Sequence, residues 1–282
     1  MRKRHTVAGG GDVALNVLEW GRPDGPPILF VHGWSQTYMS WLKQLESPLA
    51  ERFRLVAFDL RGHGLSAAPA AQSAYTDSAL WAADVAAVID ALGLERVVLV
   101  GWSYGGLVIT DYLRAYGAGA VAGVNLVGAT VRLDEAALGP LIGPGFYDIF
   151  ARAVGDDLEA GIDAMREFVE RCFAQKLSRA DYERTLCWNM TVRPDVRAAL
   201  AAREVDNLDV LAALACPLLL SHGRRDVVVL PAMSERVLAA CAHATASWYD
   251  DAGHGPFIED AARFNAELAD FVQLAHATTA RG

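Results

Sequence analysis

The pentapeptide Gly101-Trp-Ser-Tyr-Gly105 has the spacing of a nucleophilic serine held at a sharp turn. A β-branched apolar run, Val97–Val100, precedes it and a helical pattern follows it, which predicts a strand, a tight turn and a helix. Glycines two positions away on each side leave room for a serine with positive φ. The pattern therefore predicts that Ser103 presents its hydroxyl beside the positive end of a helix, as covalent catalysis requires.

A serine hydroxyl becomes a good nucleophile only when a base takes its proton and an acid orients that base. His254 and Asp226 each occupy a glycine-containing loop that follows a late predicted strand. Their order along the chain, serine then aspartate then histidine, is the order that accompanies this type of serine motif. We therefore predict Ser103 as nucleophile, His254 as base and Asp226 as acid.

Other residues could replace the predicted acid or base. Asp134 follows a predicted strand, whereas Asp250 and Asp251 are too near His254 in sequence to reach it comfortably. We favour Asp226 over all three. The remaining histidines are interpreted as structural, most of them in turns or near chain ends: His5, His32, His63, His222, His243 and His276.

Acyl transfer also needs two donors aimed at the oxygen that becomes negative in the transition state. The backbone N–H of Tyr104, next after the serine, is one candidate. The second is the N–H of Trp34, because His32-Gly33-Trp34 follows the apolar run Ile28–Val31 directly. Loops at the carboxyl ends of parallel strands meet at one edge of the sheet, so both donors are expected near Ser103.

The elements that must position these residues are strands alternating with helices, which predicts a doubly wound, mostly parallel α/β sheet. We predict residues 13–20 as an edge strand. The further predicted strands are 28–31, 54–58, 97–100, 121–127, 216–221 and 244–249, and the predicted helices are 41–51, 78–92, 104–116, 231–240 and 260–276.

The alternation stops after the core strand predicted at residues 121–127. Residues 132–211 are helix-like and rich in large apolar side chains, so we predict a helical lid inserted into a core of residues 1–131 and 212–282. The side chains expected to bind substrate include Trp188, the best single candidate in the lid. The full set is Trp34, Trp102, Phe146, Trp188, Met190 and Phe257.

Composition excludes several classes of function. The 282 residues carry a formal net charge of −9, which argues against a nucleic-acid or anionic-membrane partner. No apolar run is long enough to span a membrane, and no export signal is recognised, so a cytoplasmic protein is expected. The four cysteines show neither disulfide-framework nor zinc spacing, and no metal or organic cofactor is expected: Cys172, Cys187, Cys216 and Cys241.

With these motifs in view, the chain resembles α/β-hydrolase-fold enzymes of the capped serine esterase, lactonase and cofactor-free haloperoxidase-like group. The matching segments run in order from about residue 28 to 258: His32-Gly-Trp34, Asp59-Leu-Arg-Gly-His-Gly64, Gly101–Gly105, His222-Gly-Arg-Arg-Asp226 and Gly253-His-Gly-Pro-Phe257. The resemblance implies the same triad, with Trp34 and Tyr104 as oxyanion donors.

Two features of the chain bear on this resemblance. Epoxide hydrolases and haloalkane dehalogenases carry an aspartate where Ser103 stands, so those relatives are disfavoured. Gly255 departs from the bulkier residue expected beside the catalytic histidine, which either leaves extra room near the base or has no consequence.

The expected function is hydrolysis of carboxylic esters or lactones of small to medium apolar acids through an acyl-enzyme. Alternatives are C–C bond hydrolysis or peracid formation by the same triad, or a ligand-sensing homologue with slow turnover. The expected partner is a small-molecule substrate, and the chain is expected to act as a monomer or homodimer.

Overall fold

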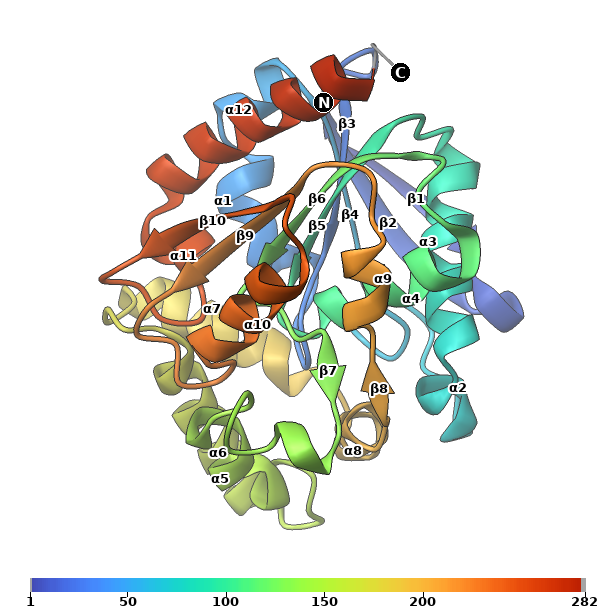
Figure 1. The fold of residues 1–282 in the computed structure, drawn as a ribbon. Coiled ribbons are helices and arrows are strands. Elements are labelled where there is room, and N and C mark those ends of the chain that lie inside the picture. Colours follow the sequence, from blue (N-terminus) through green and yellow to red (C-terminus); the bar gives the residue numbers. More distant parts are fainter. Residues whose placement is uncertain (1, 280–282) are drawn as a thin grey trace.

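The centre of the molecule is an eight-stranded sheet in the order β1-β2-β4-β3-β5-β6-β9-β10 (Figure 1). The structure is a computed structural model that describes residues 2–279. All neighbouring strands run parallel except at β2, which is antiparallel to both β1 and β4. The strand bounds are Lys3–Ala8 (β1), Ala14–Gly21 (β2), Pro27–Val31 (β3), Arg54–Phe58 (β4), Val97–Trp102 (β5), Val121–Val127 (β6), Leu218–Gly223 (β9) and Ala244–Tyr249 (β10).

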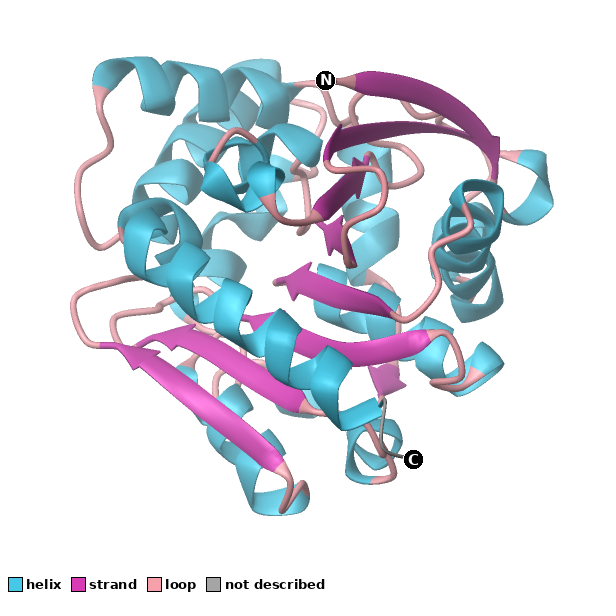
Figure 2. Ribbon diagram, turned by 90° about the horizontal axis from the view of Figure 1, so that it is seen from above, coloured by secondary structure: helices cyan, strands magenta, loops and turns pink. Residues whose placement is uncertain are grey.

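The central strands are apolar because helices cover both faces of the sheet (Figure 2). Every residue of β3, β5 and β6 is buried. One face carries α1 (Leu42–Leu45), α11 (Pro256–Glu259) and α12 (Ala261–Thr279), which contact one another. The other carries α3 (Ser78–Leu92), α4 (Gly105–Tyr116), α9 (Leu208–Ala212) and α10 (Pro231–Ala240), with the short α2 (Ser73–Thr76) before α3. The predicted doubly wound, mostly parallel sheet is confirmed.

Between β6 and β9 the chain forms a helical insert within the predicted lid region 132–211, and Figure 1 shows it packed beyond one end of the sheet. Its helices are α5 (Pro144–Ala153), α6 (Leu158–Cys172), α7 (Arg179–Met190) and α8 (Pro194–Ala201). The sequence predicts no strand here, but β7 (Arg132–Leu133) and β8 (Val205–Asp206) pair antiparallel. This short ladder joins the two ends of the insert.

Two predicted elements were wrong in detail. The strand predicted at residues 13–20 is not an edge strand, because β1 pairs along its outer side. The helix predicted at 41–51 breaks into α1 and two short 3₁₀ turns. Ser47 accepts a hydrogen bond from the N–H of Leu49, and Pro48 has no N–H to continue the α-helical pattern.

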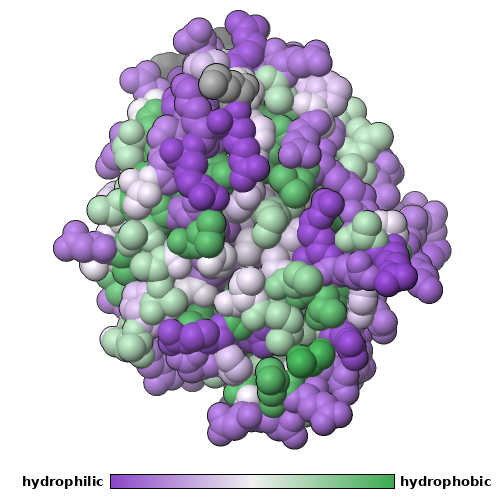
Figure 3. All heavy atoms as spheres, turned by 180° about the vertical axis from the view of Figure 1, so that it is seen from behind, coloured by the Kyte–Doolittle hydropathy of each residue, from purple (hydrophilic) through white to green (hydrophobic). Residues whose placement is uncertain are grey.

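The surface is mixed in character. Figure 3 shows polar and charged side chains interspersed with small apolar groups on the face opposite to that of Figure 1. None of the helices in the described part of the chain is long and apolar enough to cross a membrane.

Candidate active site

Ser103 lies at a strained turn between β5 and α4. Its φ is +55°, a left-handed conformation that a non-glycine residue adopts only when its surroundings impose it. Its N–H donates to Val127 O, and its carbonyl accepts from the N–H groups of Gly106 and Thr130. A Cβ on Gly101 would lie 2.9 Å from Gly105 O, and one on Gly105 would lie 2.4 Å from Val31 O. Glycine is therefore required on both sides of the serine, as the pentapeptide predicts.

Asp226 and His254 are brought together in the loops after β9 and β10. Asp226 Oδ2 lies 2.7 Å from His254 Nδ1, and both residues are buried. Asp226 Oδ1 accepts hydrogen bonds of 2.8 and 3.1 Å from the N–H groups of Val228 and Val229. Because Nδ1 donates to the carboxylate, Nε2 is the ring nitrogen of His254 that can accept a proton.

His222 also contacts the predicted acid, a role that sequence analysis missed. Its Nε2 lies 3.2 Å from Asp226 Oδ2 and 2.9 Å from Val229 O, so this nitrogen lies between two acceptors and carries the ring proton. Its Nδ1 then accepts from the Ser234 hydroxyl at 2.7 Å. His222 and His254 therefore both bond to the same oxygen of the Asp226 carboxylate. The only signal in the sequence is its position at the end of a buried strand, four residues before Asp226.

The environment of Asp226 keeps it ionised. Burial by itself would raise the pKa of this carboxyl, but the charge of His254 and the hydrogen bonds from His222 and His254 outweigh it and lower the pKa from 3.8 to about 2. The carboxylate is therefore charged throughout the pH range in which the protein would work.

The alternative acids have other roles. Asp134 caps the turn at residues 135–137, accepting from the Ala137 N–H at 2.8 Å, and pairs with Arg132. The Asp250 and Asp251 side chains are exposed and pair with Arg224 and Arg225. In residues 2–279, His254 pairs with no carboxylate other than that of Asp226.

The loop 33–36 follows β3 and approaches the serine from the neighbouring strand. A Cβ on Gly33 would lie 2.9 Å from Ser103 Cβ, so the two segments are in close contact. Within the described residues, the N–H groups of Trp34 and Tyr104 donate to no protein acceptor. Both remain available for an oxygen bound beside Ser103.

Two neutral histidines hold this loop from the core side. His32 Nε2 accepts from the Leu60 N–H at 2.9 Å, and His63 Nε2 lies 3.3 Å from the Ser35 N–H. Burial lowers the pKa of His32 from 6.5 to about 4 and that of His63 from 6.5 to about 3. Their structural interpretation agrees with these contacts.

Because the pKa values of these two histidines are lowered in the folded chain, we expect the protein to lose stability in mild acid. A histidine with a lowered folded pKa stabilises the protein fully above 6.5, its unfolded pKa. As pH falls below 6.5, His63 is protonated in the unfolded chain. In the folded chain it stays neutral until the pH approaches its lowered pKa of about 3. We expect His63→Gln to reduce the slope of unfolding free energy against pH between 6.5 and 4 by about 1.4 kcal/mol per pH unit. Denaturant titrations at several pH values measure this slope. The exposed His243→Gln is the matched control, and equal slopes for both variants would contradict the prediction.

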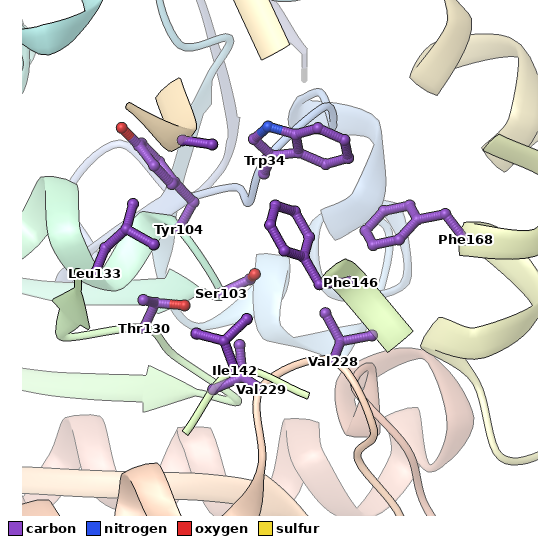
Figure 4. A pocket seen from close by; sticks show the side chains of 11 residues that line it. Trp34, Ser103, Tyr104, Thr130, Leu133, Ile142, Phe146, Phe168, Val228 and Val229 are labelled. Atoms are coloured by element: carbon purple, nitrogen blue, oxygen red, sulfur yellow. The ribbon is translucent and has the colours of Figure 1, made fainter. Parts of the chain in front are cut away.

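An apolar cavity of about 30 Å³ opens at Ser103, whose hydroxyl points toward the ring of lining side chains (Figure 4). Trp34 forms edge-to-face contacts with Phe146 and Phe168 of the insert, with ring centroids 5.1 and 5.3 Å apart. The remaining lining residues come from both the core and the insert: Tyr104, Thr130, Leu133, Ile142, Ala201, Val228 and Val229.

The cavity contains only two of the six residues predicted to bind substrate. Trp34 and Phe146 line it, whereas Trp102, Trp188, Met190 and Phe257 do not. Trp102 lies under His254 and donates its indole N–H to the His254 carbonyl, and Phe257 packs between Trp41 and Trp102. Trp188 faces the loop 33–36 instead, where its indole N–H donates to Gln36 Oε1 at 2.7 Å. Met190 packs, partly buried, against the hydrophobic core.

The space beside Gly255 is filled by the insert. A Cβ at this position would lie 2.5 Å from the ring of Phe173, and the His254 N–H donates to Cys172 O at 2.8 Å. The expectation of extra room near the base was therefore wrong. The glycine instead lets the end of α6 pack directly on the histidine loop.

The described residues contain no group of three or more histidine, cysteine or acidic side chains that could hold a metal ion. Cys172, Cys216 and Cys241 are buried and Cys187 is exposed, and all four are free thiols.

Comparisons with known proteins agree with this architecture. The chain is 30% identical to a non-heme haloperoxidase of Rhodococcus erythropolis, over 90% of this chain and 94% of that protein. The esterase RhEst1 of Rhodococcus sp. ECU1013 superposes with a TM-score of 0.91 at 37% identity, covering 96% of this chain and 98% of that one. A candidate aryl esterase of Burkholderia cenocepacia superposes with a TM-score of 0.93 at 35% identity, covering 98% and 100%.

The sequence pattern of the alpha/beta hydrolase family matches residues 28–267. This range includes the Ser103 turn, the Asp226 and His254 loops and the whole helical insert. The chain therefore belongs to the alpha/beta hydrolase family.

Proposed function

We propose that this protein is a serine esterase that cleaves carboxylic esters of small apolar acids. The observation that carries the proposal is the buried Asp226–His254 hydrogen bond of 2.7 Å, held against Trp102, which directly precedes a strained Ser103 that faces an apolar cavity. The similarity to esterases of known structure supports the same class of reaction.

In the proposed mechanism, His254 Nε2 takes the hydroxyl proton as Ser103 Oγ attacks the ester carbonyl. The N–H groups of Trp34 and Tyr104 bind the resulting oxyanion, and each such donor is typically worth about 10²–10³ in kcat. His254 then protonates the alcohol as its C–O bond breaks. A water molecule, deprotonated by the same histidine, attacks the acyl-enzyme and releases the acid.

The cavity favours short acyl groups. The cavity is small, with a volume of about 30 Å³, and its walls are almost entirely apolar. The helical insert supplies Phe146 and Phe168 to these walls, so we propose that residues 132–211 act as the lid that selects the acyl group. Lactones fit the same chemistry when the acyl and alcohol parts are small.

A turnover panel tests this proposal. We expect the purified protein to hydrolyse p-nitrophenyl acetate or butyrate over many turnovers, and the decanoate much more slowly. Several lactones and a vinylogous diketone complete the panel. Preferential cleavage of the diketone would indicate a C–C hydrolase. A single burst of product with no further turnover would indicate a ligand sensor.

A second candidate function is peracid formation, which the similarity to a non-heme haloperoxidase favours. Hydrogen peroxide would replace water in attacking the acyl-enzyme, so the Ser103 ester bond breaks and the peroxide O–O bond is kept in the peracid. Bromination of a dione in the presence of acetate, peroxide and bromide measures this activity. Bromination faster than hydrolysis of the best ester would make it the principal reaction.

Truncating a cavity side chain is expected to change acyl-chain preference. Phe146→Ala should raise kcat/KM for longer acyl chains relative to acetate, because each methylene accommodated is worth about 1–3 kcal/mol. The measurement is kcat/KM across p-nitrophenyl esters of increasing length.

The matched control is Trp188→Ala, in an aromatic residue of the insert that lies outside the cavity. This variant should lose stability and keep the wild-type ranking of esters. A shifted ranking for Trp188→Ala, with an unchanged one for Phe146→Ala, would contradict the assignment of the cavity as the acyl site.

A further inference from the structure

Arg197 in α8 is a buried cation without a counter-charge. Its exposure is 2%, and no carboxylate oxygen in residues 2–279 lies within ion-pair distance of its guanidinium. Burial lowers its pKa from 12.5 to about 10, so it stays charged at neutral pH. Burying a cation without an acid is costly unless hydrogen bonds replace those made by water. The partners of this guanidinium therefore indicate its role.

Each contact of Arg197 lies either in the insert or in the loop 33–36. Its Nη1 and Nη2 donate to the carbonyls of Ala153 and Asn189, at 3.0 and 2.8 Å. Its Nε donates to Ser35 Oγ at 3.0 Å, and its own carbonyl accepts from the Trp34 indole N–H at 3.0 Å. One residue of the lid thus holds two consecutive residues of this loop.

The loop needs such support because its conformation is strained. Ser35 has a φ of +59°, which is unfavourable for a serine. The only core contact to its N–H among the described residues is the 3.3 Å hydrogen bond to His63. On the insert side, the Ser35 hydroxyl also lies 3.2 Å from Asn189 O, and Gln36 bonds to both Asn189 and Trp188. The orientation of the Trp34 N–H, immediately before Ser35, therefore depends on how the insert is packed.

We propose that Arg197 is a positioning residue for the oxyanion site: through Ser35 and the Trp34 indole it holds the Trp34 N–H where the negative oxygen forms. The inference rests on the proposed function, since it assigns the N–H to that oxygen. Because the same arginine joins α5, α7 and α8 to the loop, the position of the Trp34 N–H, and with it the full rate, depends on how the lid packs. Displacing a catalytic group by about 1 Å can cost about 10² in rate.

The test uses Arg197→Lys, Arg197→Met and Ser35→Ala in the full chain. Lysine keeps the charge but cannot reproduce the three-way fork of the guanidinium. Ser35→Ala removes the hydrogen bond from Arg197 Nε to the loop, together with the contact of the Ser35 hydroxyl with Asn189 O. It leaves the bonds of the guanidinium to Ala153 and Asn189. Arg193→Met, an exposed arginine one turn earlier that pairs with Asp195, is the matched control.

The first readout is the rate at which a fluorophosphonate labels Ser103, followed by intact mass. The phosphoryl oxygen takes the place of the oxyanion, so the rate reports on the donors without ester turnover. We expect labelling to fall about 10- to 100-fold in both Arg197 variants and about 3- to 10-fold in Ser35→Ala. Arg193→Met should stay within about 2-fold of wild type. With the best ester, kcat should fall in parallel and KM should change less than about 3-fold, the pattern of an interaction made in the transition state.

Thermal unfolding identifies which variants are folded. Wild-type labelling in a folded Arg197 variant would overturn the proposal and leave Arg197 with a structural role only. If neither Arg197 variant folds, Ser35→Ala decides in the same way. If wild-type protein is labelled at Ser103 but hydrolyses no ester, the proposed function is refuted. The labelling rates of the variants then still test the role of Arg197. Wild-type protein that is not labelled at Ser103 would refute both.

Discussion

Ser103→Ala is expected to lower kcat for ester hydrolysis by about 10⁶, the usual cost of removing a triad serine. The reason is that in the proposed mechanism Ser103 supplies the attacking oxygen, whereas His254, Asp226 and the backbone donors assist it. The fold should be unaffected, because alanine keeps the Cβ that the left-handed turn already accommodates at φ +55°. Steady-state assays with independently purified batches measure the loss.

The control for this prediction is Ser73→Ala, which removes the hydroxyl of an exposed serine in α2. It should retain wild-type kcat and the same thermal unfolding curve. If Ser103→Ala kept more than a few per cent of activity in every batch, the nucleophile would lie elsewhere in the chain.

Asp226→Asn is expected to lower kcat by about 10⁴, the second largest effect. An asparagine amide would present a donor to His254 Nδ1, which favours the tautomer whose Nε2 carries a proton and cannot act as base. With its NH2 toward His254, the amide keeps an oxygen for the Val228 and Val229 N–H groups but places a second donor against His222 Nε2–H. We therefore expect a loss of stability as well, which thermal unfolding would show separately from kcat.

Asp250→Asn and Asp251→Asn make the same chemical change on exposed carboxylates that pair with Arg224 and Arg225. Both should keep kcat within about 2-fold, since exposed ion pairs contribute little. A collapse of kcat in either, with near wild-type activity in Asp226→Asn, would move the acid to the loop that carries His254.

Sequence reasoning works best where a local pattern has one steric solution. The glycines around Ser103 and the buried strand before them specify the turn without reference to the rest of the chain. The pairing of Asp226 with His254 is also predictable, because the carboxyl ends of parallel strands converge on one edge of the sheet. Both features depend on rules that hold for any sheet of this type.

The cavity could not be predicted in the same way. Its walls combine Trp34, Phe146, Phe168 and Val228, which lie on separate segments whose approach depends on how the insert packs. Trp188 is a large aromatic residue of the insert, as Phe146 and Phe168 are, yet its indole N–H donates to Gln36 and it lies outside the cavity. The contact of Phe173 with Gly255 and that of His222 with Asp226 are likewise tertiary, and no periodicity in the sequence encodes them.

The missed elements have simpler causes. β1 is short and polar, with only Val7 buried, so its pattern resembles an exposed tail until it pairs with β2. The helix after residue 41 ends early because Pro48 interrupts it. Neither error moves a residue of the candidate active site.

Trapping the acyl-enzyme shows directly whether Ser103 is the nucleophile. Wild-type protein turning over its best p-nitrophenyl ester is quenched in acid within the first turnovers, digested and analysed by peptide mass mapping. We predict an acyl adduct on Ser103 that is absent in Ser103→Ala. The adduct should accumulate in a His254 variant that is given an activated ester, because such an ester acylates the serine quickly while the step that needs the base to activate water is lost. Sustained hydrolysis with no adduct on Ser103, or with the adduct on another residue, would contradict it.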